Sequence, residues 1–96
     1  MKVATQVSAR HGREILLDCF KAALDAVDGR RAVVRQLARE RLEGDWQVLA
    51  IGKAAGSMTL GALEELGERL RQALVVTCPG HVPAELAGHG GLRVIE

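Results

Sequence analysis

The chain has 96 residues, of which 48% are hydrophobic and 26% charged, and its formal net charge is +1. This length allows one small domain at most. The near-balance of charge argues against a nucleic-acid-binding surface and against a polybasic segment that binds membranes. No apolar stretch approaches the roughly 20 residues of a membrane span, so we expect a cytoplasmic protein. Cys19 and Cys78 form no CxxC pair, and we expect free, buried thiols in a reducing compartment.

Two helices are predicted in the first half of the chain. Residues 13–27 show helical spacing with one buried face, formed by Leu16, Phe20, Ala23, Leu24 and Val27. Gly29 tolerates the left-handed backbone that ends such a helix. Residues 30–42 predict a second amphipathic helix, with an inner face of Val33, Val34, Leu37 and Ala38.

The second half alternates between strands and helices. Residues 46–51 are apolar with little alternation, which predicts a central strand covered on both faces. Residues 53–70 return to helical spacing, and residues 73–77 predict a second buried strand. The proline- and glycine-containing stretch 79–91 is typical of a loop, and residues 92–95 begin a third strand.

This order predicts an α/β fold, a Rossmann-like parallel sheet with flanking helices. The sheet looks truncated after its third strand, because a parallel sheet normally carries helices on both faces. An unprotected sheet edge seeks partners, so we expect self-association through that exposed edge.

A lone cation follows the first predicted strand. Gly52 and Lys53 stand at its carboxyl end, where open α/β sheets bind ligands. The helix that begins near Lys53 would direct its free N–H groups and positive end to the same place. The next four residues, Ala54, Ala55, Gly56 and Ser57, are small, so a ligand or another backbone segment can approach closely. The pattern predicts an anion site, and the alternative is an ordinary surface lysine.

Comparison with common phosphate-, dinucleotide- and metal-binding motifs limits the kinds of site that the sequence predicts. The residues around Lys53 lack the first glycine and the Ser or Thr of a P-loop. The spacing of Gly52 and Gly56 does not match a dinucleotide fingerprint, and Thr77 and Cys78 offer no carboxylate for a ribose. His81 would lie on the same sheet edge as Lys53 and could bind substrate or a proton, although a solvated loop histidine is the alternative. No spacing typical of metal ligands is present.

Three segments resemble the glycerate 2-kinase family. They are Arg13–Leu17 followed by Phe20–Asp28, Gly52-Lys53-Ala54 followed by Met58, and Leu74–Thr77 followed by Gly80-His81. The resemblance runs from about Arg13 to the end of the chain. It departs from the family at Ala73, where a glycine is usual, and at Cys78-Pro79, where a Lys-Tyr pair is usual. The chain also ends at Glu96, before the family's usual Glu-Ala-Gly-His-Pro segment.

The resemblance implies that residues 1–96 are the N-terminal part of an ATP-dependent glycerate 2-kinase, with no second domain present. It implies that Lys53 faces the transferred phosphate, that Gly52, Ala54, Ser57 and His81 line the phosphate or substrate site, and that ATP and Mg²⁺ are cofactors. The isolated segment is expected to be inactive, because nothing in its sequence supplies a Mg²⁺ site. Alternatives are a non-catalytic remnant or anion-binding module and, with less support, a hydroxypyruvate reductase, a label that relatives sometimes carry.

Overall fold

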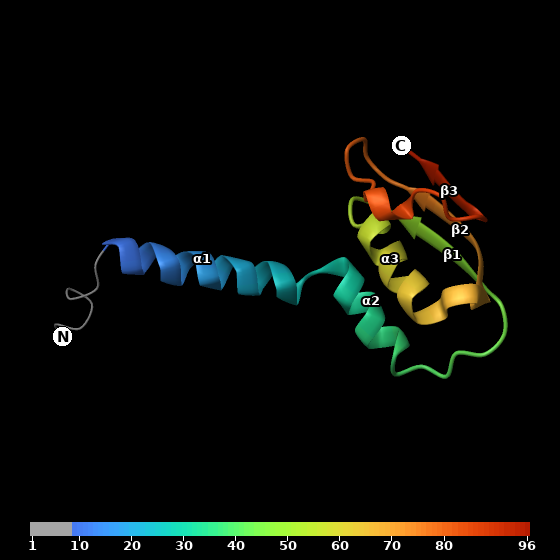
Figure 1. Cartoon of the computed structure of the whole chain (residues 1–96), viewed down its shortest axis with the longest axis horizontal. Helices are drawn as coiled ribbons and strands as arrows, with labels where there is room; N and C mark the ends of the chain where they lie inside the picture. The colour runs from blue at the N-terminus through green and yellow to red at the C-terminus, as the bar shows by residue number, and fades with distance from the viewer. Residues whose placement is uncertain (1–8) are drawn as a thin grey trace.

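The computed structural model describes residues 9–96, which form three helices and a three-stranded sheet (Figure 1). The longer elements in chain order are α1 (Ala9–Ala26), α2 (Gly29–Leu37), β1 (Trp46–Ile51), α3 (Ala55–Leu66), β2 (Leu70–Val76) and β3 (Leu92–Ile95). Two single 3-10 turns, η2 (Gly67–Arg69) and η3 (Ala84–Leu86), precede β2 and β3. The three strands are parallel in the order β1-β2-β3, so the predicted α/β class is confirmed.

The core lies between the sheet and α3. On β2, Ala73 and Val75 are buried, and on α3 the buried apolar side chains include Leu60 and Leu66. Because strand side chains alternate between two faces, one face of β2 packs against α3 and the other is left more open. The buried core therefore lies on the helix-covered face of the sheet.

The expectation that residues 46–51 form a central strand covered on both faces is wrong. The strand β1 lies at an edge of the sheet and pairs with β2 alone within the described residues. Its side chains alternate between half-buried and exposed, and Leu49 and Ile51 are 66% and 71% exposed. The uniform apolar composition hid this alternation, because both faces of the strand carry aliphatic side chains.

The helix α2 packs against α3 through glycines. A Cβ added to Gly61 would lie 2.4 Å from the carbonyl oxygen of Arg30, and one added to Gly29 would lie 2.8 Å from Met58 Cγ. Asp28 caps α2 by accepting a hydrogen bond from the N–H of Arg31 at 2.9 Å. These contacts fix the first turn of α2 beside α3.

The second helix is shorter than predicted. It ends at Leu37 rather than at residue 42, and Ala38, which was expected on its inner face, is exposed. The segment that follows turns toward η2, where the Arg69 guanidinium donates a hydrogen bond to the carbonyl oxygen of Leu42. This tertiary contact replaces the last helical turn that the sequence pattern favoured.

The first helix forms as predicted, from Ala9 rather than residue 13, but its apolar face is not buried. None of the residues of α1 is buried, and Phe20 is 60% exposed. The helix extends away from the α/β part formed by residues 29–96 (Figure 1). The Cα radius of gyration is 18.5 Å, whereas a compact domain of this length has about 12–13 Å.

The predicted loop between β2 and β3 carries a core residue. Leu86, in η3, is 2% exposed and is among the most deeply buried side chains of the described chain. Cys19 and Cys78 are free, as expected, but both are exposed rather than buried. Across residues 9–96, no helix combines the length and hydrophobicity needed to cross a membrane.

Candidate functional site

A tight turn joins β1 to α3 at the carboxyl edge of the sheet. Gly52 has a φ of +124°, a conformation that favours glycine, and its N–H donates to the carbonyl oxygen of Val76 at 2.9 Å. Its own carbonyl oxygen accepts from the N–H of Ala55 at 3.1 Å. Lys53 is therefore held in the turn rather than in the first turn of the helix, which begins two residues later than predicted.

Lys53 is exposed on this turn. Within residues 9–96 it forms no ion pair, whereas five of the other basic side chains of that part do. The helix that follows it has Ala54 at its N-cap, and no side chain accepts a hydrogen bond from its first N–H groups there. An exposed cation thus stands directly before an uncapped helix N-terminus, an arrangement that favours an anion.

The small residues of the first turn of α3 serve different purposes. A Cβ added to Gly56 would lie 2.4 Å from Pro83 Cδ and 3.1 Å from the carbonyl oxygen of His81. Gly56 therefore admits another backbone segment, which is one of the two roles that the sequence left open. The hydroxyl of Ser57 donates to the carbonyl oxygen of Ala54 at 3.0 Å, so its proton is engaged within the helix.

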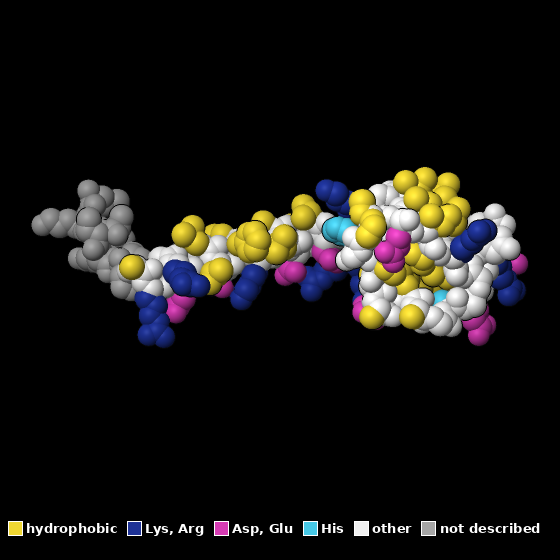
Figure 2. Space-filling view, turned by 90° about the horizontal axis from the view of Figure 1, so that it is seen from above, with side chains coloured by type: hydrophobic (Ala, Val, Ile, Leu, Met, Phe, Trp, Pro, Cys, Tyr) yellow, Lys and Arg dark blue, Asp and Glu magenta, His cyan; other side chains and the backbone are white. Residues whose placement is uncertain are grey.

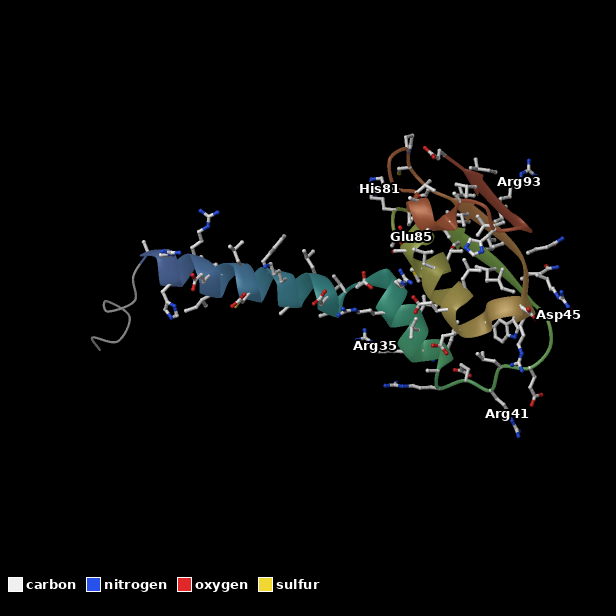
Figure 3. All side chains as sticks on the ribbon, in the orientation of Figure 1. Arg35, Arg41, Asp45, His81, Glu85 and Arg93 are labelled. Atoms are coloured by element: carbon white, nitrogen blue, oxygen red, sulfur yellow. The ribbon has the colours of Figure 1, made fainter. Side chains whose placement is uncertain are left out.

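His81 belongs to the same edge of the sheet. Its N–H donates to the carbonyl oxygen of Cys78 at 3.1 Å, and this turn brings its backbone against Gly56 at the start of α3. The imidazole is exposed and lies on the loop above α3 (Figure 3). Gly52, Lys53, Ala54 and His81 thus gather around one end of α3, while the Ser57 hydroxyl is directed to its own helix.

Thr77 is a further residue at this edge, and the burial of its hydroxyl was not predicted from the sequence. It follows β2, its N–H donates to the carbonyl oxygen of Ile95 at 2.9 Å, and it continues the alternation that buries Ala73 and Val75 toward α3. Thr77 is 7% exposed, and its Oγ1 has no hydrogen-bond partner. Because every second side chain of a strand lies on the same face, the alternation from Ala73 would have placed this hydroxyl on the helix-covered face. It lies at the carboxyl edge of the sheet, as Lys53 does.

An unsatisfied buried hydroxyl destabilises the fold, so we expect Thr77→Val to raise the free energy of unfolding by about 1 kcal/mol. The matched control is Thr59→Val, because Thr59 is also buried but its hydroxyl donates to the carbonyl oxygen of Ala55 at 2.7 Å. That control should lose about 0.5–1.5 kcal/mol. Urea unfolding of both variants measures the difference. Equal decreases in the free energy of unfolding for the two variants would mean that the Thr77 hydroxyl has a hydrogen-bond partner in the folded chain.

The described residues offer little for a metal ion. No group of three or more His, Cys, Asp or Glu side chains within residues 9–96 is arranged to hold one. The acidic side chains near the α2–α3 contact are engaged by Arg30, which pairs with Glu64 and, at 3.8 Å, with Glu85. At the carboxyl edge of the sheet, the structure thus combines an exposed lysine with a helix N-terminus that has no side-chain cap.

Three parallel strands in one sheet with flanking helices place the chain in the class of open α/β folds. Residues 15–96 match the family described as "Domain of unknown function (DUF4147)", and the chain belongs to that family. The comparisons with curated proteins and with solved structures gave no match.

Proposed function

We propose that this chain is the N-terminal segment of an ATP-dependent glycerate 2-kinase, which transfers a phosphoryl group from ATP to glycerate. The observation that carries the proposal is the exposed Lys53 on the Gly52–Ala54 turn, directly before the uncapped N-terminus of α3. Two further points support it. The resemblance of the three sequence segments covers both sides of this turn, and the matched domain is the N-terminal part of glycerate kinase-type proteins.

Lys53 would stabilise the negative charge on the transferred phosphoryl group. Phosphoryl transfer depends mainly on positioning and electrostatic stabilisation. The rigid turn supplies the positioning, since Gly52 is hydrogen-bonded to both β2 and α3. The N–H groups at the start of α3 would bind phosphate oxygens beside Lys53, and His81 would contact the phosphate or the substrate from the facing loop.

Mg²⁺ would supply further charge neutralisation at the phosphates, as the resemblance implies. Residues 9–96 contain no group of three or more His, Cys, Asp or Glu side chains arranged to hold a metal ion. The Mg²⁺ ligands and the base that accepts the proton of the glycerate hydroxyl are therefore not assigned to residues of this segment.

The second candidate is a non-catalytic module that binds anions at the same turn. It is favoured by one observation, that residues 9–96 hold no group of three or more His, Cys, Asp or Glu side chains arranged to bind the metal ion that phosphoryl transfer requires. A hydroxypyruvate reductase has less support, because the turn after β1 lacks the Gly-x-Gly-x-x-Gly spacing that holds a dinucleotide.

These candidates can be separated by an ADP-release assay. The assay uses the longer enzyme whose first segment we propose residues 1–96 to be. ATP, Mg²⁺ and glycerate should yield ADP and 2-phosphoglycerate in equal amounts, whereas hydroxypyruvate should not oxidise NADH or NADPH. ATP binding without ADP release would support the anion-binding module instead. Oxidation of NADH or NADPH that depends on added hydroxypyruvate and forms glycerate would support the reductase and overturn the kinase proposal.

A further inference from the structure

The loop that carries His81 is fixed at both of its ends. It begins with a tight turn, in which the N–H of His81 donates to the carbonyl oxygen of Cys78 at 3.1 Å. Gly80 has a φ of +83°, as the third residue of a type II turn requires, and Pro79 stands before it at the position that favours proline. At the other end, Leu86 is buried in η3. The path of the residues between these two ends is therefore set by the fold.

Between these ends the loop packs on α3 at Gly56. A Cβ added to Gly56 would lie 2.4 Å from Pro83 Cδ and 3.2 Å from Pro83 Cγ. The carbonyl oxygen of His81 would lie 3.1 Å from the same Cβ. Ordinary contacts between carbon atoms are about 3.5–4.0 Å long, so a side chain at this position would push the loop away by about 1 Å. Only a residue without a side chain allows the loop to lie this close to α3.

Pro83 cannot make room for such a side chain by changing its rotamer. Its ring includes its own backbone nitrogen, and its φ of −62° is the value at which the ring holds it. A shift of Cδ is therefore a shift of the backbone itself. Because His81 is only two residues earlier, and its own carbonyl oxygen is also close to Gly56, that shift would move His81 as well.

Gly56 lies near Lys53 as well as near His81. It follows Lys53 by three residues, so the two Cα atoms are at most about 11 Å apart. The imidazole of His81 is exposed at the same end of α3 (Figure 3). The contact at Gly56 thus holds two exposed side chains that can donate hydrogen bonds, those of Lys53 and His81, at one edge of the sheet.

We propose that Gly56 is a positioning residue, which places His81 so that its imidazole donates a hydrogen bond to the phosphate bound at the Lys53 turn. The inference rests on the proposed function, in which that turn binds a phosphate of ATP. A shift of about 1 Å would lengthen a hydrogen bond of about 2.8 Å to a distance at which it no longer forms. His81 would then lose the phosphate, whereas the turn of Lys53, which Gly52 joins to β2 by a hydrogen bond, would stay in place.

The test measures the Kd for ATP of the 96-residue chain from amide chemical shifts at residues 52–55. Gly56→Ala should raise this Kd about 10-fold or more, because a hydrogen bond to a charged group is lost. His81→Ala should raise it by a similar factor. Lys and Arg side chains are spread over the surface of the molecule (Figure 2), so shifts at other residues do not enter the Kd.

Gly61→Ala is the matched control for Gly56→Ala. A Cβ added to Gly61 would also lie 2.4 Å from its nearest neighbour, but that neighbour is the carbonyl oxygen of Arg30, on the side of α3 that faces α2. Both changes replace a glycine of α3 with alanine, so their effects on helix propensity are of the same kind. Gly61→Ala should leave the Kd within about two-fold, at a temperature where circular dichroism shows both variants folded.

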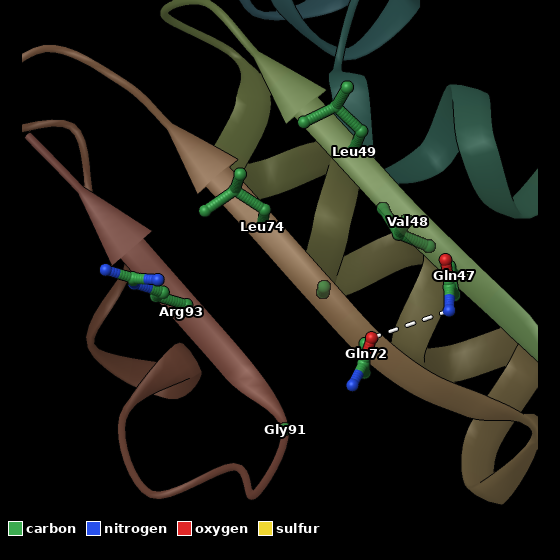
Figure 4. Close-up of a pocket in the computed structure, with 8 residues that line it drawn as sticks. Gln47, Val48, Leu49, Gln72, Leu74, Gly91 and Arg93 are labelled. Carbon is green, nitrogen blue, oxygen red and sulfur yellow. Dashed lines mark hydrogen bonds between the residues drawn. The ribbon is translucent and has the colours of Figure 1, made fainter.

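A second control concerns a hollow on the side of the sheet that α3 does not cover. The hollow has a volume of about 610 Å³, and its lining includes Gln47, Gln72 and Arg93 (Figure 4). Arg93 is the cation that ATP would contact if it bound there. Arg93→Met should leave the Kd measured at residues 52–55 within about two-fold of the unmodified value.

A double-mutant cycle shows whether Gly56 acts through His81. In a His81→Ala chain, Gly56→Ala should raise the Kd no further, because the hydrogen bond that it disturbs is already absent. Pro83→Ala removes the ring that obstructs the new side chain, so adding it to Gly56→Ala should restore most of the lost affinity. This rescue keeps the proposal testable even if Gly56→Ala alone is poorly folded.

The outcomes separate a failure of this inference from a failure of the proposed function. If ATP shifts no amide at residues 52–55 of the unmodified chain, the proposed phosphate site is wrong, and this role of Gly56 with it. If ATP binds there but Gly56→Ala leaves the Kd unchanged, only the inference about Gly56 is overturned. An equal effect of Gly56→Ala with and without His81, an equal effect of Gly61→Ala, or a failure of Pro83→Ala to restore binding would overturn it too.

Discussion

Replacing Lys53 with Met is expected to lower kcat for glycerate phosphorylation by roughly 10²–10³ in the kinase of which we propose this chain is part, with a much smaller change in KM. The reason is that Lys53 would act on charge that develops on the transferred phosphoryl group. An interaction made mainly in the transition state affects turnover rather than substrate binding. Steady-state kinetics with varied glycerate and varied ATP measure both constants.

Two further variants test whether the effect depends on the shape and on the position of the lysine side chain. Lys53→Arg keeps the charge but replaces a compact ammonium with a broad planar group, so we expect incomplete recovery of kcat. Lys21→Met makes the same chemical change on the exposed surface of α1 and should leave kcat unchanged. Near-normal turnover in Lys53→Met would show that Lys53 is an ordinary surface lysine.

Replacing Leu86 with Ala is expected to destabilise the fold by about 2–5 kcal/mol, because it leaves a cavity where a side chain only 2% exposed is packed. Leu86 comes from the η3 turn in the long connection between β2 and β3. A loss of this size is a large fraction of the roughly 5–15 kcal/mol of a typical domain. We expect the melting temperature to fall by at least about 8 °C.

The neighbouring Glu85→Ala provides the control for Leu86→Ala. Glu85 occupies the same turn but is exposed, and its ion pair with Arg30 at 3.8 Å contributes about 0–1 kcal/mol at most. Thermal and urea unfolding of both variants compare the two. A loss below about 1 kcal/mol for Leu86→Ala would mean that the connection is not packed against α3.

The strands and helices of the α/β part could be predicted from the sequence because their patterns are local. The apolar run before Gly52, the helical spacing after it and the second run ending near Thr77 define a strand–helix–strand unit. What the pattern could not reveal was the position of each strand in the sheet. A strand with aliphatic residues on both faces gives no alternation, so β1 was expected in the centre although it lies at an edge.

The candidate site, too, was predictable only where it depends on residues close together in the sequence. The turn at Gly52 and Lys53 was predictable, because a strand end and a helix start meet there and the carboxyl ends of parallel strands share one edge. The role of Gly56 depended on a residue far along the chain, since only the fold brings Pro83 and His81 against it. The buried hydroxyl of Thr77 was hidden for a similar reason, because its burial depends on where α3 lies.

Titration of ATP into the isotope-labelled 96-residue chain, followed by amide chemical shifts, tests most directly whether the turn before α3 binds phosphate. We expect the largest shifts at Gly52–Ser57 and at His81, and a much weaker response in Lys53→Met than in Lys21→Met. Inorganic phosphate should cause smaller shifts at the same amides, and adenosine alone should leave them in place. Shifts confined to other parts of the chain, or a response that Lys53→Met leaves unchanged, would contradict the proposed site.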